Sequence, residues 1–264
     1  MRDQLRVLRH GLAVQWRMWR GLHTWRTWTF AWLSRLLVQA CFYALVGRML
    51  GSQEQVDYLL IGNLVAIMAI DATVVILLAV GERQAGTLAL MVAAPATHLT
   101  AYLGKGLVHL GSGVAASTIA FLTLPPLFGV ALPWPWAGFV PVMIFLVGVS
   151  CYCYGTCVAA FVLRFPSARW VALNLSYLVI MTFSGVNVPT SFWPGWVHAL
   201  TSVLPMTHGL AAIRTFIAGG PLPGVLGNLG WELAVGAAWF TVAALAFDRM
   251  VRHGRRDGTI EFAG

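Results

Sequence analysis

Charged side chains are scarce in this sequence, and their scarcity excludes most water-soluble folds. Only 10% of the 264 residues are Asp, Glu, Lys or Arg, whereas a soluble globular chain carries about 25%. Hydrophobic residues make up 59% of the sequence, and its mean hydropathy is +0.76. Because so few polar side chains cannot coat a surface that faces water, the composition predicts an integral membrane protein.

Cysteine is also rare, and its placement argues against both disulfides and bound metal. All four cysteines lie in apolar runs, which does not suit a disulfide framework. Cys153 and Cys157 share a helix face by their spacing, but no histidine or acid accompanies them, so no metal site is predicted. We expect packing roles for all four, which are Cys41, Cys151, Cys153 and Cys157.

The sequence also lacks a nucleotide-binding loop. Such a loop needs Gly-x-x-x-x-Gly-Lys-Ser/Thr, and the one Gly-Lys pair, Gly104-Lys105, is followed by another glycine. The chain itself is therefore not expected to hydrolyse ATP. An intramembrane enzyme built on Ser112 and His109 is disfavoured, because Gly-Ser pairs within a span are typical of close helix packing.

Long stretches without charge predict where the chain crosses the bilayer, because about 20 apolar residues span its core as a helix. No charged residue occurs between Lys105 and Arg164, and this length suits two crossings joined by a proline-rich outer hairpin. A further crossing is expected to begin at Trp170. The remaining spans are expected at residues 25–46, 58–80 and 226–247. The sequence thus predicts an all-α membrane protein with six transmembrane helices.

Basic residues are distributed unequally between the two sides of this six-span arrangement. The net charge is +8, and 14 of the 17 basic residues fall in the N-terminal segment, the second and fourth connections and the C-terminal tail. Arg48 and Arg214 lie on the other side, and Arg35 lies within a span. Because basic residues mark the cytoplasmic face, both termini are expected in the cytoplasm. The basic excess is therefore expected to serve contact with the lipid bilayer, and no nucleic-acid partner is expected.

Three segments fall outside the simple crossings. Residues 1–22 repeat apolar side chains at helical spacing with arginines between them, which predicts an amphipathic helix in the inner interface. Residues 189–220 contain several prolines, so short outer helices that re-enter the membrane are expected there. Residues 250–264 are expected to form a cytoplasmic tail.

Two ionisable residues fall at membrane depth, where a charge costs about 2.5 to 3.5 kcal/mol. Arg35 lies 19 residues before Glu54, near the tip of the first hairpin, and Asp71 lies 17 residues after it. In an antiparallel helix pair these depths nearly coincide, so an Arg35–Asp71 ion pair is predicted; a proton or substrate relay is the functional alternative. Glu232 is similarly expected to meet Arg214.

Two motifs stand at corresponding places, after the second and the fifth predicted spans. The first reads GERQAGTLALMVAAPATHLTAYLGKGL, with Glu-Arg, Gly-Thr-Leu, a small residue before proline, and Gly-Lys in that order. The second reads SGVNVPTSFWPGWVHALTSVLPMTHGLAAIRTFIAGG. Both resemble the type-2 ATP-binding-cassette (ABC) exporter permeases, and the resemblance extends over essentially the whole chain.

The resemblance implies that residues 1–264 form one transmembrane permease domain of the cytoplasmic (inner) membrane. Residues 81–100 would form a cytoplasmic coupling segment that fits a separate ABC ATPase subunit, present in two copies and binding ATP and Mg, so that this chain holds no cofactor. A second permease subunit, identical or related, would complete the dimer. Ala89 stands where many relatives carry an acid, so one charge contact would be missing. The residues expected to couple to the ATPase are Glu82, Arg83, Gly86, Thr87, Leu88, Leu90, Met91 and Pro95.

The resemblance implies export but leaves the cargo open. Short and almost chargeless outer loops favour an amphiphilic small molecule, drug-like or lipid-like; a lipid-linked glycan or polysaccharide is the alternative, and a membrane assembly protein without transport is another. Polar and aromatic residues of the spans are expected either to line the path or to bond between helices. They are Asn63, Thr73, Asn174, Tyr177, Thr182, Phe183 and Asn187. The expected outer gate consists of Pro194, Trp196, Pro205 and Arg214.

Overall fold

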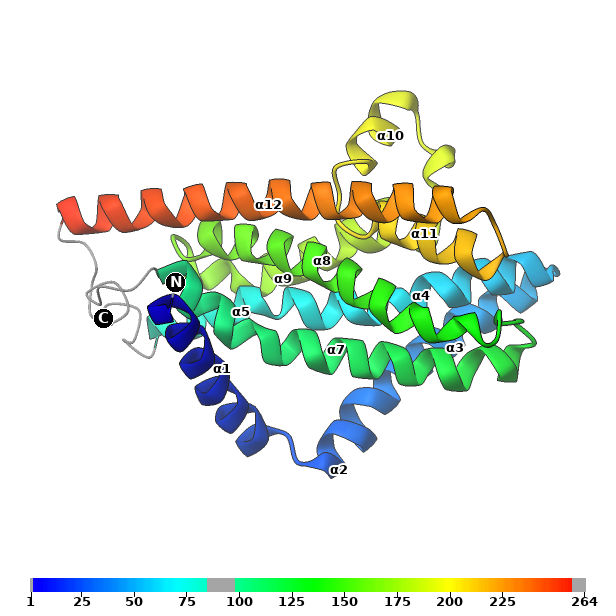
Figure 1. The fold of residues 1–264 in the computed structure, drawn as a ribbon, viewed down its shortest axis with the longest axis horizontal. Helices are drawn as coiled ribbons and strands as arrows, with labels where there is room; N and C mark the ends of the chain where they lie inside the picture. Colours follow the sequence, from blue (N-terminus) through cyan, green and yellow to red (C-terminus); the bar gives the residue numbers. More distant parts are fainter. Residues whose placement is uncertain (1, 85–97, 258–264) are drawn as a thin grey trace.

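Helices form the part of the chain that the structure describes, residues 2–84 and 98–257, and no strand occurs there. In this computed structural model the long helices run side by side along one axis (Figure 1). The helices are α1 (Arg2–Leu22), α2 (Trp25–Thr27), η1 (Trp28–Leu33), α3 (Ser34–Met49), α4 (Gln53–Thr73), α5 (Val75–Gln84), α7 (His98–Phe128), η2 (Trp136–Phe139), α8 (Val140–Val162), η3 (Pro166–Ala168), α9 (Arg169–Phe183), η4 (Thr190–Phe192), α10 (Gly195–Thr201), α11 (Thr207–Ile217) and α12 (Leu222–Asp257). The predicted all-α class is confirmed.

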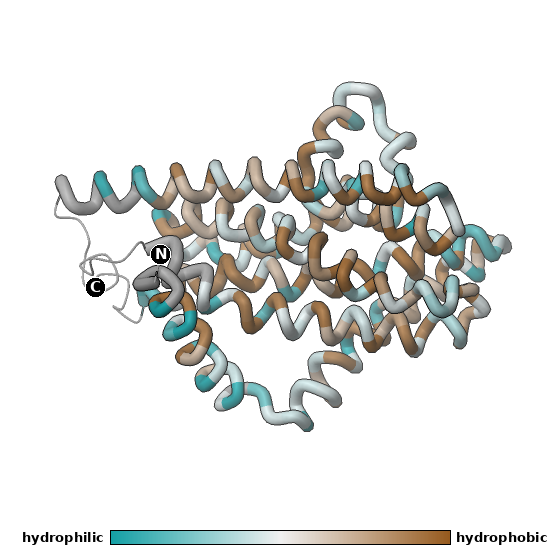
Figure 2. Tube along the Cα trace, viewed as in Figure 1, coloured by the Kyte–Doolittle hydropathy of each residue, from teal (hydrophilic) through white to brown (hydrophobic). Residues whose placement is uncertain are grey.

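Five stretches of the described chain, and not the six predicted, are long and apolar enough to cross a membrane. They are Trp25–Met49, Gln53–Gln84, Gly104–Phe128, Trp136–Val162 and Leu222–Arg249. Hydrophobic residues dominate the middle of these helices, while the tip between α3 and α4 is hydrophilic (Figure 2). This distribution is typical of a multi-pass membrane protein.

The missing sixth span corresponds to α9, which has only 15 residues. At about 1.5 Å per residue such a helix is shorter than the ~30 Å hydrocarbon core. Its flanking residues nevertheless reach both ends of the central hairpin. Leu163, before α9, accepts a hydrogen bond from Arg83 at the end of α5, and Gly185, after α9, accepts one from Tyr58 near the start of α4. The stretch from 163 to 185 therefore runs antiparallel to α4 and α5 along most of their length.

Helix α4 forms the centre of the bundle. It is apolar on all sides, which is typical of a helix surrounded by protein, and most residues in the middle of the α4–α5 span are buried. It packs against α3, α7 and α8. Gly113 and Gly148 lie directly against Met68, so that two neighbouring helices approach α4 closely.

Helix α1 confirms that the first 22 residues favour a helix. It slants away from the bundle axis, and hydrophilic and hydrophobic residues alternate along it (Figures 1 and 2). It packs on α7, where a Cβ on Gly104 would lie 2.5 Å from the carbonyl oxygen of Leu8. The first described residues and the C-terminal end of α12 lie at the same end of the bundle (Figure 1).

Candidate functional site

A cavity of about 460 Å³ opens between the N-terminal helices, α4, α7 and α9. Its walls are mostly aromatic and aliphatic, with a small number of polar groups. Trp19, His23, Trp28, Trp32, Arg35, Gln39, Ile70, Asp71, Thr73, Val74, Leu77, His109, Ser112, Trp170, Leu173, Asn174 and Tyr177 line it. A volume of this order suits a drug-sized ligand.

Asp71 is the buried carboxyl group of this cavity, and the residue is only 2% exposed. Its Oδ1 accepts a hydrogen bond from Trp32 Nε1 at 3.1 Å, and its Oδ2 is buried with no hydrogen-bond partner among the described residues. Trp28, four residues before Trp32, donates from Nε1 to Ser112 Oγ at 3.0 Å. The two indoles thus fasten the start of the first span to α4 and α7.

The predicted Arg35–Asp71 ion pair is wrong for the residues that the structure describes, because no ion pair joins these two side chains there. Arg35 is exposed, and its guanidinium carbon lies 5.1 Å from the ring centre of Trp32. Equal depth along two antiparallel helices was inferred correctly, since both residues line one cavity. Rotation of α3 about its axis, which the sequence does not specify, places the Arg35 guanidinium over the Trp32 ring and not at the Asp71 carboxyl group.

The residues predicted to line a path divide into two groups. Thr73, Asn174 and Tyr177 line the cavity, and Tyr177 accepts a hydrogen bond from Gln39 Nε2 at 2.7 Å. Four others do not line it. Asn63 Nδ2 donates a hydrogen bond to Asn187 Oδ1 at 3.0 Å. Phe183 packs against Trp193, and Thr182 precedes Phe183 at the end of α9.

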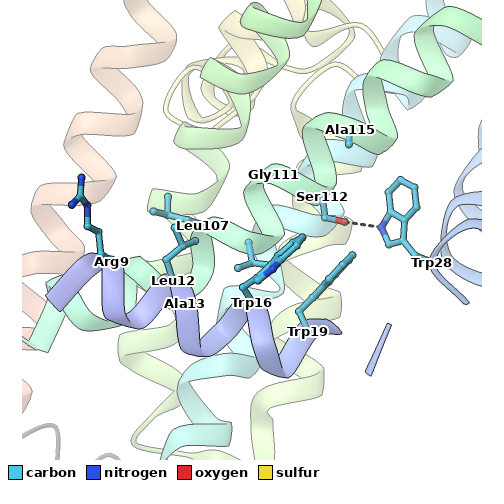
Figure 3. A pocket seen from close by; sticks show the side chains of 11 residues that line it. Arg9, Leu12, Ala13, Trp16, Trp19, Trp28, Leu107, Gly111, Ser112 and Ala115 are labelled. Atoms are coloured by element: carbon cyan, nitrogen blue, oxygen red, sulfur yellow. Dashed lines mark hydrogen bonds between the residues drawn. The ribbon is translucent and has the colours of Figure 1, made fainter. Parts of the chain in front are cut away.

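A second pocket, of about 600 Å³, lies under α1. Leu12, Trp16 and Trp19 of α1 face α7, with Arg9 at one end and the Trp28–Ser112 hydrogen bond at the other (Figure 3). Trp19, Trp28 and Ser112 line both this pocket and the cavity around Asp71. The two spaces therefore adjoin, with the Trp28–Ser112 contact on their common wall.

Two of the predicted coupling residues lie at the base of the bundle. Glu82 forms an ion pair with Lys105 at 2.5 Å, and both side chains are largely buried. Arg83 donates to the carbonyl of Leu163. These contacts join the end of α5 to α7 and to the end of α8. The other predicted coupling residues lie outside the described part of the chain; they are Gly86, Thr87, Leu88, Leu90, Met91 and Pro95.

Arg214 of α11 holds the segment after α9 against α4. It donates to the carbonyls of Gly185 at 2.7 Å, Tyr58 at 2.8 Å and Val186 at 3.2 Å. Its guanidinium carbon lies 3.5 Å from the ring centre of Tyr58. Burial lowers the pKa of Arg214 to about 10, so the side chain stays charged at neutral pH.

The other predicted gate residues differ in exposure and contacts. Pro194 immediately precedes α10, and Trp196 within it is 72% exposed. The carbonyl of Pro205 accepts a hydrogen bond from Ser184 Oγ at 3.1 Å. The structure therefore brings Pro205 and Arg214 together around the segment after α9.

Glu232 does not meet Arg214, contrary to the prediction. It is fully buried and accepts hydrogen bonds from the backbone N–H groups of Met206 at 2.7 Å and Gly209 at 2.8 Å. These groups belong to the first turn of α11, where a carboxylate is favourable. Met206 has a φ of 76°, in the left-handed region, so the capped turn begins with an unusual backbone conformation.

Sequence reasoning missed several cavity residues, chiefly Trp28, Trp32, Gln39, Ser112 and Trp170. Tryptophan is common at membrane surfaces, so the sequence does not distinguish Trp28 and Trp32 from interface anchors. Their spacing of four residues carried a signal for a shared helix face, but nothing in the sequence indicated which neighbour that face meets.

Comparisons with known proteins give one family and one type of relative. The family model for ABC-2 type transporters matches residues 11–217. The "Probable doxorubicin resistance ABC transporter permease protein DrrC" of Mycobacterium tuberculosis, from strains CDC 1551 / Oshkosh and ATCC 25618 / H37Rv, is 28% identical over 82 residues. That match covers 31% of this chain and 30% of the relative, so the chain matches less than a third of the relative's length. No solved structure matches the chain.

Proposed function

The chain belongs to the ABC-2 type transporter family, and from this we propose that it is the transmembrane permease subunit of an ATP-driven exporter. A separate ABC ATPase, present in two copies, would bind ATP and Mg and deliver the energy. A second permease subunit, identical or related, would complete the transport path. The proposed cargo is an amphiphilic small molecule, drug-like or lipid-like.

The observation that carries this proposal is the connection between the coupling segment and the cavity. Residues 85–97 connect α5 to α7 in the sequence, and the Glu82–Lys105 ion pair joins these two helices on either side of this connection. The α4–α5 span carries Asp71 and α7 carries Ser112, and both side chains line one cavity. A force applied by an ATPase to this base would therefore act on two helices that line the cavity.

The arrangement of the helices supports six crossings of the cytoplasmic membrane. Both termini would then lie on its cytoplasmic side. The stretch 163–185 passes along α4 and α5 and acts as the fifth crossing, although α9 itself is short. Helices α10 and α11 would then form the re-entrant outer segment. The excess of basic residues at the end of the bundle that holds α1 supports the assignment of this end to the cytoplasm.

The cavity supports the choice of cargo. Its size suits a drug-sized molecule better than a long glycan, and its walls combine aromatic surfaces with few polar groups. The partial relative is named for resistance to doxorubicin, which favours a drug-like cargo further.

The experiment that tests this function is purification of the tagged chain from its own host in mild detergent, with identification of the proteins that accompany it. We expect an ABC ATPase subunit to co-purify. A Glu82→Ala/Gly86→Val variant should lose it, because both changes fall in the coupling segment. Glu54→Gln, at the opposite end of the central hairpin, is the matched control and should retain it.

Two results would contradict the proposal. If no ATPase accompanies the chain in any detergent or lipid, the transporter function is wrong and an assembly role takes its place. If the ATPase accompanies the coupling variant and the wild type equally, residues 81–100 are not the contact.

A further inference from the structure

A buried carboxylate with one free oxygen faces the cavity between α4, α7 and α9. Asp71 is 2% exposed, and Trp32 bonds only its Oδ1. Its Oδ2 is buried with no hydrogen-bond partner in the described chain. Buried carboxylates without a full set of partners are rare because desolvation destabilises them. Ser112 also lies close to this carboxyl group, and Oδ2 still lacks a partner in hydrogen-bond geometry among the described residues, so it can accept from a further donor or interact with a cation.

The surroundings of this oxygen are aromatic. Trp28 and Trp32 line one part of the cavity, and Trp170 and Tyr177 line another. Indole and phenol rings attract organic cations through their π faces, and flat ligands stack on them. We propose that the cavity binds an amphiphilic organic cation, with Asp71 as its counter-ion and the tryptophans as its apolar walls. This site would hold the cargo if the proposed function is right.

The positive charges near the cavity do not satisfy Asp71. Arg35 is exposed and lies over the Trp32 ring instead of reaching the carboxylate. The other basic side chains in the walls are His23 and His109, and neither is bonded to Asp71. In a low-dielectric cavity, opposite charges interact strongly at short range. A ligand cation inside the cavity would therefore interact most strongly with the Asp71 carboxylate.

Two other occupants fit the site less well. A metal ion would need several oxygen or nitrogen ligands, and no group of three or more His, Cys, Asp or Glu in the described residues could hold one. A proton alone would satisfy Asp71 but would leave about 460 Å³ of aromatic-walled space unexplained. An organic cation accounts for both the charge and the volume.

The apolar pocket under α1 provides a route to this site. It adjoins the cavity along Trp19, Trp28 and Ser112, and the Trp28–Ser112 hydrogen bond stands on the common wall (Figure 3). A membrane-dissolved molecule could place its apolar part between α1 and α7 and pass this contact to bring its cation to Asp71.

The test is direct binding to the purified chain in detergent. Tetraphenylphosphonium, a permanent cation, and tetraphenylborate, an anion of nearly the same shape, are compared by equilibrium binding of radiolabelled probe. The wild type should bind the cation, and Asp71→Asn should weaken it at least tenfold without a comparable effect on the anion. Glu54→Gln removes an exposed carboxylate from the same helix and should leave both affinities unchanged.

Equal affinity of wild type and Asp71→Asn for the cation would overturn the proposal, and so would equal losses of cation and anion binding in a folded variant. If Asp71→Asn fails to elute as a single species, Trp170→Ala decides. This exposed ring at the cavity wall should contribute several-fold to cation affinity without affecting folding, and unchanged binding would refute the site.

The assay needs neither an ATPase nor transport, so it separates the site from the proposed function. Asp71-dependent binding without a co-purifying ATPase would reject the exporter and retain the cation site. An ATPase partner without cation binding would reject the cation site and retain the exporter.

Discussion

Replacement of Arg214 should release the segment after α9 from the bundle. Its guanidinium donates to three carbonyls, two after α9 and one in α4. Hydrogen bonds that involve a charged group contribute about 1.5 to 3 kcal/mol each. Arg214→Ala should therefore destabilise the protein by at least about 4 kcal/mol, while Arg214→Lys should lose about 3 kcal/mol, because an ammonium lacks the planar fork that reaches separated acceptors.

The assay is thermal denaturation in one detergent, followed by the fraction that remains monodisperse on size exclusion. At about 2 °C per kcal/mol for a chain of this size, the midpoint should fall by about 8 °C or more for Arg214→Ala and about 6 °C for Arg214→Lys. Arg48→Ala, an exposed arginine on α3, is the control and should change little. An Arg214→Ala variant as stable as the wild type would refute the reasoning; equal stability of Arg214→Lys would show that charge suffices without the fork.

Three further changes test other contacts. Glu232→Gln keeps an acceptor for one of the two buried N–H groups that the carboxylate caps and should lower stability by about 1 to 3 kcal/mol; an unchanged melting midpoint would show that the cap is dispensable. Gly62→Ala would place a Cβ 2.4 Å from a backbone carbonyl oxygen and should destabilise the protein strongly. Gly148→Ala would place a Cβ 2.3 Å from the flexible end of a methionine side chain, so its effect on stability should be milder. A lower melting midpoint for Gly148→Ala than for Gly62→Ala would contradict this. Glu82→Lys and Lys105→Glu should each reduce stability, and their combination should recover it by about 0.5 to 3 kcal/mol, measured in a double-mutant cycle; a strictly additive result would deny the ion pair.

Much of the architecture follows from the pattern of apolar residues. The long charge-free stretches predicted where the spans lie, and the helical repeat of residues 1–22 predicted α1, because both depend on local sequence and on the bilayer alone. The fifth span was the exception. Its apolar stretch was long enough, but the chain leaves the helix after Phe183. There Gly185 and Val186 accept hydrogen bonds from side chains of α4 and α11, and Ser184 donates to the backbone carbonyl of Pro205.

The ionisable residues show most clearly what the sequence alone could not decide. Arg35 and Asp71 were predicted at one depth, and both line one cavity, because depth follows from counting residues along two helices. Their partners could not be counted in this way. Whether Arg35 reaches Asp71, whether Asp71 meets an indole, and whether Glu232 caps α11 depend on how each helix is rotated and how closely its neighbours approach.

The sequence by itself therefore determined that this is a helical membrane protein, where its main spans run and which residues lie at membrane depth, since hydropathy and helical rise govern these features. The tertiary structure alone decided which of those residues face one another. Packing against three or four neighbouring helices at once sets helix rotation, and no single stretch of sequence contains that information.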